Sequence, residues 1–324
     1  MLEQNIFNID SPATFNRCAL EIFEYQYQQV SIYQRFCNAL KRNPSNVSTI
    51  TEIPFLPVEF FRTHPVLDSS VKAEMIFSSS GTTNTVPSKH YVADLSLYER
   101  SFLSTFERFI SKPSEITIMA LLPSYFEQEH SSLIYMVDKL IKKSGKAESK
   151  FYLDDKEQLV KTINTLESAG RPGLLIGVSY ALLDLIEAHS FNLDHIAIME
   201  TGGMKGRRKE IIREELHRHL KSGFGVEHIY SEYGMTELLS QAYSPGEGIF
   251  NCPPWMKVLT RDTEDALSYV QNTTGGVNII DLANKHSCSF IATQDLGRVY
   301  GDGSFEILGR FDNSDIRGCN LMVL

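Results

Sequence analysis

The strongest constraint on the fold is an alternation of apolar and amphipathic segments between residues 116 and 230. Short apolar runs that suit β-strands are each followed by a longer run with apolar residues at helical spacing. Strands are predicted over 116–122, 151–153, 174–178, 196–199 and 226–230, with helices over 131–143, 156–168, 180–189 and 205–221. Because a strand, a helix and a further strand usually form a parallel pair covered by the helix, this pattern predicts an α/β fold with a mostly parallel, helix-covered sheet.

The segments on either side of this core have different patterns. Residues 12–42 carry apolar residues at helical spacing, and Ser11 followed by Pro12 is typical of a helix start. Beyond Trp255, strands are predicted over 256–259, 277–280, 289–292 and 305–308, with Gly-Gly and Asp-Gly turns between them. We expect one domain over 1–324, made of a helical segment (1–60), an α/β core (61–250), a smaller β-rich subdomain (251–312) and a tail (313–324).

Charge and hydropathy restrict the function. The chain of 324 residues has 31 Lys and Arg against 40 Asp and Glu, a net charge of -9. This balance argues against nucleic-acid binding through a broad basic face, but it allows a local cationic pocket for ATP. The apolar runs 116–122 and 173–186 are too short or too interrupted to span a bilayer, and residues 1–5 do not resemble a signal peptide. We expect a cytoplasmic protein without a membrane span.

The cysteines and histidines do not suggest a metal centre. The five cysteines have no CxxC spacing, so free thiols in a reducing compartment are expected. His217 and His219 lie two residues apart in a predicted helix, which places them on different faces. Both are predicted to be surface residues and not metal ligands.

A polar loop over residues 78–90 follows a short apolar run and is rich in Ser and Thr. Backbone N–H groups and hydroxyls of such a loop can surround phosphate oxygens, Gly81 allows close approach, and Lys89 supplies positive charge. The loop therefore suits a polyphosphate. The alternative is a solvated polar loop without a ligand.

Two further polar clusters follow predicted strands, where ligands bind in open α/β sheets. Residues 200–206 (Glu-Thr-Gly-Gly-Met-Lys-Gly) contain paired glycines that let a flat ligand lie against the backbone, or they form an ordinary turn. Residues 230–237 (Tyr-Ser-Glu-Tyr-Gly-Met-Thr-Glu) offer an aromatic ring, a hydroxyl and a carboxylate, as Mg²⁺-bound ATP requires. The alternative for this second cluster is a helix start capped by Thr236.

A last cluster lies in the β-rich region. Asp295, expected just after a strand, could accept two hydrogen bonds from a ribose diol. Arg310 could reach ribose or phosphate. Asp302 and Gly303, which lie between Asp295 and Arg310 in the sequence, are typical of a hairpin turn.

Taken together, the loop 79–89, the Tyr-Gly-Met-Thr-Glu run 233–237, Asp295 and the Gly-Arg-Phe-Asp run 309–312 resemble the adenylate-forming superfamily of acyl-CoA synthetases, adenylation domains and luciferases. The resemblance covers residues 77–318. Asn84 departs from the usual glycine, and the chain ends six residues after Gly318, where most members continue into a mobile C-terminal lid domain with an adenylation lysine. This combination resembles the LuxE-like acyl-protein synthetases, and we expect the lid domain to be absent.

The resemblance implies a role for each motif residue, with ATP and Mg²⁺ as cofactors. The triphosphate is assigned to Ser79, Ser80, Gly81, Thr82, Thr83 and Lys89. Adenine is assigned to Gly202, Gly203 and Tyr233, and Gly234 belongs to the same motif as Tyr233. Thr236 is assigned to the α-phosphate and Glu237 to Mg²⁺. The ribose is assigned to Asp295 and Arg310.

The family reaction joins a carboxylic acid, with a fatty acid expected, to AMP and then to a thiol. Cys319 near the C-terminus is the internal thiol candidate, with Arg317 favouring its thiolate, although it could equally lack a role. His130 could contact the acyl carboxylate or the thiol, or start a helix. Lys89, Arg317 or a partner could replace the usual lid lysine.

Three alternatives stay open at this point. The acceptor could be coenzyme A or a separate protein, such as a reductase or an acyl carrier. The chain could be an acyl- or aryl-CoA ligase of the phenylacetate type. It could also be a non-catalytic subunit that binds an acyl group or a nucleotide.

Overall fold

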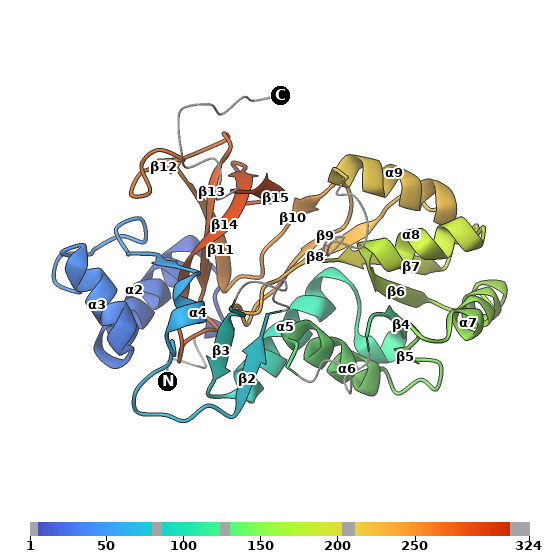
Figure 1. Cartoon of the computed structure of the whole chain (residues 1–324), viewed down its shortest axis with the longest axis horizontal. Coiled ribbons are helices and arrows are strands. Elements are labelled where there is room, and N and C mark those ends of the chain that lie inside the picture. Colours follow the sequence, from blue (N-terminus) through green and yellow to red (C-terminus); the bar gives the residue numbers. More distant parts are fainter. Residues whose placement is uncertain (1–5, 80–85, 124–129, 203–210, 312–324) are drawn as a thin grey trace. The chain divides into compact units, whose positions relative to one another are not determined.

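The chain folds as two units (Figure 1). Unit 1 comprises Met1–Val71 and Pro254–Leu324, and unit 2 comprises Lys72–Pro253. The computed structural model describes residues 6–79, 86–123, 130–202 and 211–311. The predicted helical segment and the predicted β-rich subdomain therefore belong to the same unit, and the finer division of the chain stays a prediction.

Unit 2 is built on a mostly parallel sheet, which confirms the predicted fold class. Its strand order is β5-β4-β6-β7-β8-β9, and only β9 runs antiparallel to its neighbour. The strands are β4 (Thr117–Leu121), β5 (Lys150–Phe151), β6 (Gly173–Val178), β7 (Ile196–Thr201), β8 (Tyr230–Tyr233) and β9 (Ala242–Ser244), with the short β10 (Ile249–Phe250) after them. Because β4 and β6 are buried along their whole length, they read as continuous apolar runs.

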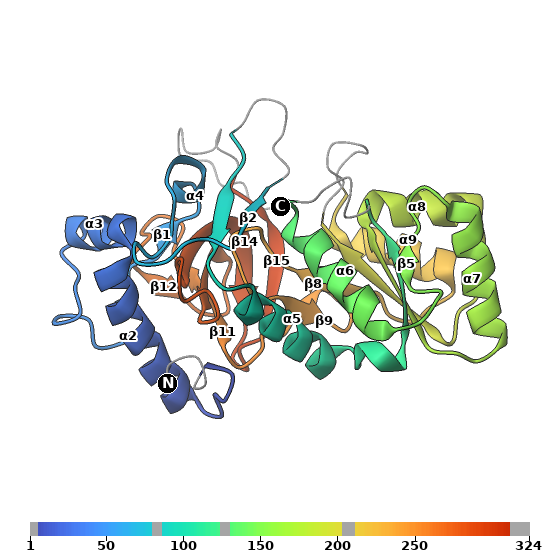
Figure 2. The same cartoon turned by 90° about the horizontal axis from the view of Figure 1, so that it is seen from below.

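Helices cover both faces of this sheet. Figure 1 shows α8 and α9 on one side and α5 and α6 on the other, and Figure 2 shows α5 and α6 side by side. The helices are α5 (Leu95–Phe109), η1 (Pro113–Glu115), α6 (Ser132–Ser144), α7 (Lys156–Ser168), α8 (Ser179–Ala188) and α9 (Arg213–Phe224). Within the described ranges, no helix is both long and apolar enough to cross a membrane.

Two predicted boundaries in unit 2 are wrong. The helix predicted over 205–221 begins at Arg213, and residues 211–212 before it are not helical. The strand predicted over 226–230 lies instead at β8, Tyr230–Tyr233. Gly225 ends α9 in the left-handed conformation (φ 68°). The residues after it form the connection from α9 to β8, and the strand therefore begins later than predicted.

A two-stranded antiparallel hairpin completes unit 2. It consists of β2 (Met75–Ser78) and β3 (Lys89–Val92), with Ser78 paired to Lys89 at its open end. The polar loop predicted from the sequence therefore joins two antiparallel strands.

Unit 1 contains the predicted antiparallel sheet. Strands β15, β14, β13, β11 and β12 are neighbours in that order, and β1 runs parallel to β14. The strands are β1 (Leu56–Pro57), β11 (Met256–Arg261), β12 (Tyr269–Val270), β13 (Gly275–Asp281), β14 (Phe290–Val299) and β15 (Phe305–Arg310). The predicted Asp-Gly turn connects β14 to β15, with Gly303 at φ 86°.

Aromatic packing attaches the N-terminal helices of unit 1 to this sheet. The single helix predicted over 12–42 is two helices, because Val30 between them has extended backbone angles. The rings of Phe23 and Tyr33 lie 6.3 and 6.1 Å from that of Phe290 on β14. The helices are α2 (Pro12–Gln29), α3 (Ser31–Ala39) and α4 (Phe60–Thr63).

A buried amide reinforces this attachment. Gln26 of α2 is 0% exposed, and its Nε2 donates to the carbonyls of Asn284 (3.0 Å) and Lys285 (2.8 Å). Its Oε1 accepts from the backbone N–H of Ser289 at 3.0 Å. Because each of these groups would be costly to bury alone, the amide fixes the register of α2 against the start of β14.

Asp68 is the centre of a second buried polar contact in unit 1. Its carboxylate accepts hydrogen bonds from the Tyr25 hydroxyl and from the backbone N–H and hydroxyl of Ser70, and it lies 3.4 Å from His286 Nδ1. Burial raises the pKa of Asp68, but the hydrogen bonds from Tyr25 and Ser70 outweigh burial and hold this pKa below its usual range.

We predict that Tyr25→Phe lowers the free energy of unfolding by about 1.5–3 kcal/mol at pH 7, because it removes a hydrogen bond to a charged group. A depressed carboxyl pKa stabilises the fold above the unfolded pKa, so this loss should shrink as the pH falls below about 4. Urea unfolding at pH 7 and at a pH below about 4 measures both effects. Tyr27→Phe is the matched control, because the Tyr27 hydroxyl donates to the exposed Asn38. Equal losses in the two variants would contradict the prediction.

Candidate functional site

The predicted phosphate loop is closed at its base by backbone and hydroxyl contacts. Ser79 donates its N–H to the Ser88 carbonyl (3.1 Å), and Ser79 Oγ accepts from the Ser88 N–H (2.9 Å). The Ser78 N–H donates to the carbonyl of His130 at 2.8 Å, which brings that predicted residue to the loop base. Lys89 and His130 are both exposed there. Four of the predicted phosphate ligands lie outside the described residues: Ser80, Gly81, Thr82 and Thr83.

His90 joins this hairpin to the Tyr-Gly-Met-Thr-Glu run. The side chain is 0% exposed, and its Nδ1 lies 2.8 Å from the carbonyl oxygen of Thr236. Since a carbonyl oxygen only accepts, Nδ1 carries the proton. The sequence does not single out His90, although the strand alternation that exposes Lys89 turns the next side chain inward.

The Tyr-Gly-Met-Thr-Glu run begins at the end of β8 and continues as a turn. Tyr233 is buried, with its ring 5.9 Å from that of Phe250, and Glu237 is 5% exposed. No helix follows among residues 234–241, which are all described, so the capping alternative for Thr236 is wrong. The run places a half-buried hydroxyl and a buried carboxylate beside the loop base.

Gly234 lies close to the carboxyl of Glu232. A Cβ atom at this position would lie 2.5 Å from Glu232 Oε1, so a larger residue would require the Glu232 side chain to move. The glycine of the motif therefore leaves room for the Glu232 carboxyl.

Glu232 itself is held from β7. The Thr201 hydroxyl donates to its Oε2 at 2.5 Å. Burial raises the pKa of the half-buried Glu232 to about 7, the hydrogen bond from Thr201 opposes this, and the charge of Glu200 adds to it. The Glu232 carboxyl is therefore partly protonated at neutral pH.

A second polar cluster lies on the opposite face of the same strands. Glu200 of β7 is 4% exposed and lies 3.5 Å from Arg213 Nε and 3.6 Å from His217 Nε2. His217 is 5% exposed, so its predicted surface position is wrong, because its side of α9 packs on Glu200 and Ser231. His219 is exposed, as predicted.

The predicted adenine glycines follow β7. Gly202 is exposed, has φ 66°, and its carbonyl accepts from the Ser179 hydroxyl at 2.9 Å. Gly203 lies outside the described residues. Of this pair, the structure therefore places one glycine at the carboxyl edge of the sheet.

In unit 1 the predicted ribose residues face each other. Asp295 lies within β14 and not after it, and it pairs in register with Arg310 of β15. Arg310 Nε donates to Asp295 Oδ1 at 3.0 Å, and the Asp295 N–H donates to the Thr293 hydroxyl at 3.0 Å. Asp295 is 5% exposed, whereas the Arg310 side chain is 79% exposed. The carboxylate is therefore oriented by an arginine that solvent reaches.

The donor set for Mg²⁺ is small. Among the described residues, no group of three His, Cys, Asp or Glu side chains could hold a metal ion. A single carboxylate such as Glu237 is still adequate for Mg²⁺ that arrives with ATP, since phosphate oxygens and waters supply the other ligands. Cys319 lies outside the described residues.

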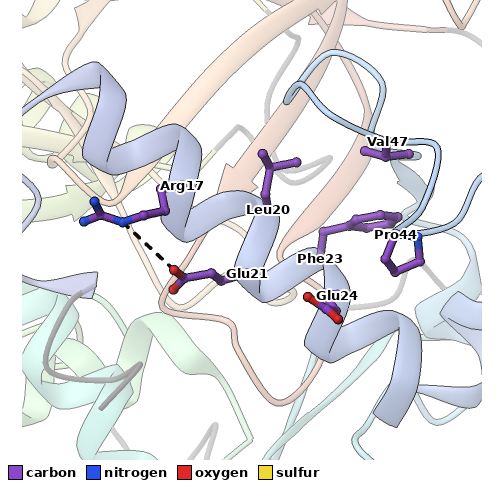
Figure 3. Close-up of a pocket in the computed structure, with 7 residues that line it drawn as sticks. All are labelled: Arg17, Leu20, Glu21, Phe23, Glu24, Pro44 and Val47. Atoms are coloured by element: carbon purple, nitrogen blue, oxygen red, sulfur yellow. Dashed lines mark ion pairs between the residues drawn. The ribbon is translucent and has the colours of Figure 1, made fainter.

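A surface groove of unit 1 lies between α2 and the loop around Pro44 (Figure 3). Leu20, Phe23 and Val47 form its apolar part, and Arg17 contacts Glu21 at 4.0 Å on its charged side. It contains none of the motif residues described above.

Comparison with solved structures shows the fold. The chain resembles 2-hydroxyisobutyryl-CoA ligase in complex with 2-HIB-AMP and CoA, with a TM-score of 0.63 and 12% identity over 94% of this chain and 77% of the ligase. It also resembles ATP-bound MatB from Rhodopseudomonas palustris, with a TM-score of 0.53 and 15% identity over 72% of this chain. That match covers 47% of MatB, so the chain spans about half of MatB's length.

Sequence comparison identifies the family. No curated protein sequence matches the chain significantly. Residues 8–324 match the acyl-protein synthetase family LuxE, which is nearly the whole sequence. The architecture, the motif order and this match agree, and the chain belongs to the LuxE acyl-protein synthetase family.

Proposed function

We propose that this chain activates a carboxylic acid with ATP to an acyl-adenylate and passes the acyl group to a thiol, with a protein cysteine as the acceptor. The observation that carries the proposal is the hydrogen bond from His90 to the Thr236 carbonyl. It joins the loop that ends at Lys89 to the run that carries Thr236 and Glu237. This connection supports a shared role for Lys89, Thr236 and Glu237 in binding the phosphates.

The first step joins two anions. A carboxylate oxygen of the acid attacks the α-phosphorus of ATP, the bond to the bridging oxygen breaks, and pyrophosphate leaves. Positioning and charge neutralisation are the main requirements. Lys89 and the loop after Ser79 would hold the leaving phosphates, and Thr236 would contact the α-phosphate. Mg²⁺ at Glu237 would neutralise phosphate charge.

The nucleoside is assigned by the same proposal. Tyr233 and Gly202 would border the adenine, and the Asp295 carboxylate, oriented by Arg310, would accept hydrogen bonds from the ribose hydroxyls.

The second step needs a thiolate. Its sulfur attacks the acyl carbonyl carbon, the bond to AMP breaks, and a thioester and AMP result. Cys319 is the proposed acceptor, and Arg317 beside it in the sequence would favour its thiolate. Among the described cysteines, Cys18, Cys37 and Cys288 are buried, so they are poor acceptors.

A ligase that uses coenzyme A is the second candidate. It is favoured by the match over 94% of this chain to a ligase whose structure holds an acyl-adenylate and CoA. Formation of an acyl-CoA without any protein adduct would select this candidate.

We predict that Lys89→Met lowers kcat/KM for ATP in acid-dependent ATP–pyrophosphate exchange by about 10²–10³, because it removes charge from the triphosphate. Lys72→Met is the matched control, since Lys72 is also an exposed lysine of unit 2. Exchange measured with a panel of carboxylic acids tests both variants. Equal rates for Lys89→Met and the unchanged chain would show that the triphosphate binds elsewhere.

We predict that incubation with ATP and acid gives a hydroxylamine-labile acyl adduct that Cys319→Ser abolishes. Intact mass spectrometry measures the adduct. Cys252→Ser is the control and should keep it, since Cys252 is a half-exposed cysteine of unit 2. An adduct that persists in Cys319→Ser would assign the acyl group to another residue.

A further inference from the structure

β14 bulges at the residues that carry the proposed ribose carboxylate. Gly276 of β13 pairs with Leu296 of β14, whereas the next pair along the two strands is Asn278 with Ala292. Three residues of β14, 293–295, therefore stand opposite a single residue of β13. A bulge of this kind interrupts the ladder of backbone hydrogen bonds and turns the side chains of the extra residues in a new direction. The backbone groups that the ladder leaves unpaired need other partners, because burying them without one is costly.

Arg261 of β11 supplies such partners. Its Nη1 donates to the carbonyl of Val277 at 2.9 Å and to Asn278 Oδ1 at 2.7 Å. Its Nη2 donates to the carbonyl of Thr293 at 2.6 Å, and the ring of Phe311 lies 5.4 Å from its Cζ. A planar guanidinium with several fixed donors suits this position, since it can bind a carbonyl of each strand at the same time.

Gly276 allows the arginine side chain to reach β14 across β13, which lies between β11 and β14 in the sheet. Arg261 and Gly276 are paired in register, and directly paired residues have the same face of the sheet. A Cβ atom on Gly276 would lie 2.5 Å from Cζ of Arg261 and 2.7 Å from its Nε. The space that a side chain at this glycine would take is therefore occupied by the guanidinium.

Hydrogen bonds of Thr293 connect Arg261 to Asp295. Besides accepting from the guanidinium through its carbonyl, the 2% exposed Thr293 donates its hydroxyl to the Val277 carbonyl at 2.9 Å. The same hydroxyl accepts from the backbone N–H of Asp295 at 3.0 Å. The backbone of Asp295 is thus held through Thr293, while Arg310 contacts its carboxylate.

We propose that Arg261 is a positioning residue for the nucleoside, which holds the bulge of β14 in the conformation that presents the Asp295 carboxylate to the ribose hydroxyls of ATP. The inference rests on the proposed adenylation and adds the residue that sets how well the chain distinguishes ribonucleotides from deoxyribonucleotides. The hydrogen bonds of Arg261 described above go to β13 and β14, so Arg261 acts through Asp295 and not on the nucleotide itself.

The test is acid-dependent pyrophosphate exchange by the full chain with ATP, 2′-deoxy-ATP and 3′-deoxy-ATP. A site built to bind a hydroxyl rejects the analogue that lacks it, because the buried acceptor is then left without its partner. The kcat/KM for ATP should therefore exceed that for at least one deoxy analogue by about 100-fold or more.

Two variants disturb the bulge in different ways. Arg261→Lys keeps the charge but loses the fork that binds two carbonyls, and Gly276→Ala keeps the arginine but displaces its guanidinium. Each variant should raise KM for ATP about tenfold with little change in kcat. The kcat/KM for the rejected analogue should stay nearly unchanged, so the preference for ATP should fall about tenfold.

Arg298→Lys is the matched control. Arg298 also lies on β14 but outside the bulge, and its Nη1 lies 3.6 Å from Glu306 Oε1. This variant should leave the preference for ATP unchanged. Because the preference is a ratio measured on one protein sample, a smaller folded fraction lowers both rates and does not alter the ratio.

The outcomes separate the positioning role from adenylation. A reduced ATP preference in Arg261→Lys and Gly276→Ala, but not in Arg298→Lys, supports the positioning role. Equal losses with ATP and both analogues in the two bulge variants overturn it, since Arg261 would then be structural only. Equal use of all three nucleotides by the unchanged chain also overturns it and leaves adenylation intact. Absence of exchange with every acid overturns the adenylation proposal, and the positioning role falls with it.

Discussion

The hydrogen bond between the His90 ring and the Thr236 carbonyl is the contact on which the site in unit 2 depends. The His90 side chain is buried, so the imidazole cannot exchange this partner for water without opening the structure. The imidazole holds the backbone of a turn that has no helix or strand of its own. Through β3, the same residue fixes the position of Lys89 at the end of the polar loop. One side chain thus connects two segments that are 146 residues apart in the sequence.

In unit 1, aromatic packing and a buried amide hold β14 in position. β14 carries Phe290 in the aromatic core under α2 and α3, and it carries Asp295 five residues further along. The buried amide of Gln26 fixes the segment that leads into this strand. The carboxylate that we propose for the ribose is therefore placed on an element whose other end is packed into the core. Arg310 on the neighbouring strand then sets the direction of the carboxylate.

The sequence pattern predicted the parallel sheet, its helices and the antiparallel strands correctly, because buried strands and amphipathic helices have distinct periodicities. It misplaced β8 and the position of Asp295, since both lie in polar stretches where a strand has no apolar alternation to reveal it. His217 was assigned to the surface because helical spacing alone does not show that Glu200 lies opposite it. The role of His90 is visible only through its contact with Thr236, which is far away in the chain. The assignments to Ser80, Gly81, Thr82, Thr83, Gly203 and Cys319 stay predictions.

The alternation of side chains along β8 has a consequence for how such a protein can diverge. Glu232 and Tyr233 are successive residues, so one points toward α5 and the other toward α9 and Phe250. Substitutions on the α5 side can alter polarity and shape without disturbing the aromatic contacts on the other side. The two faces of this strand can therefore change independently of each other.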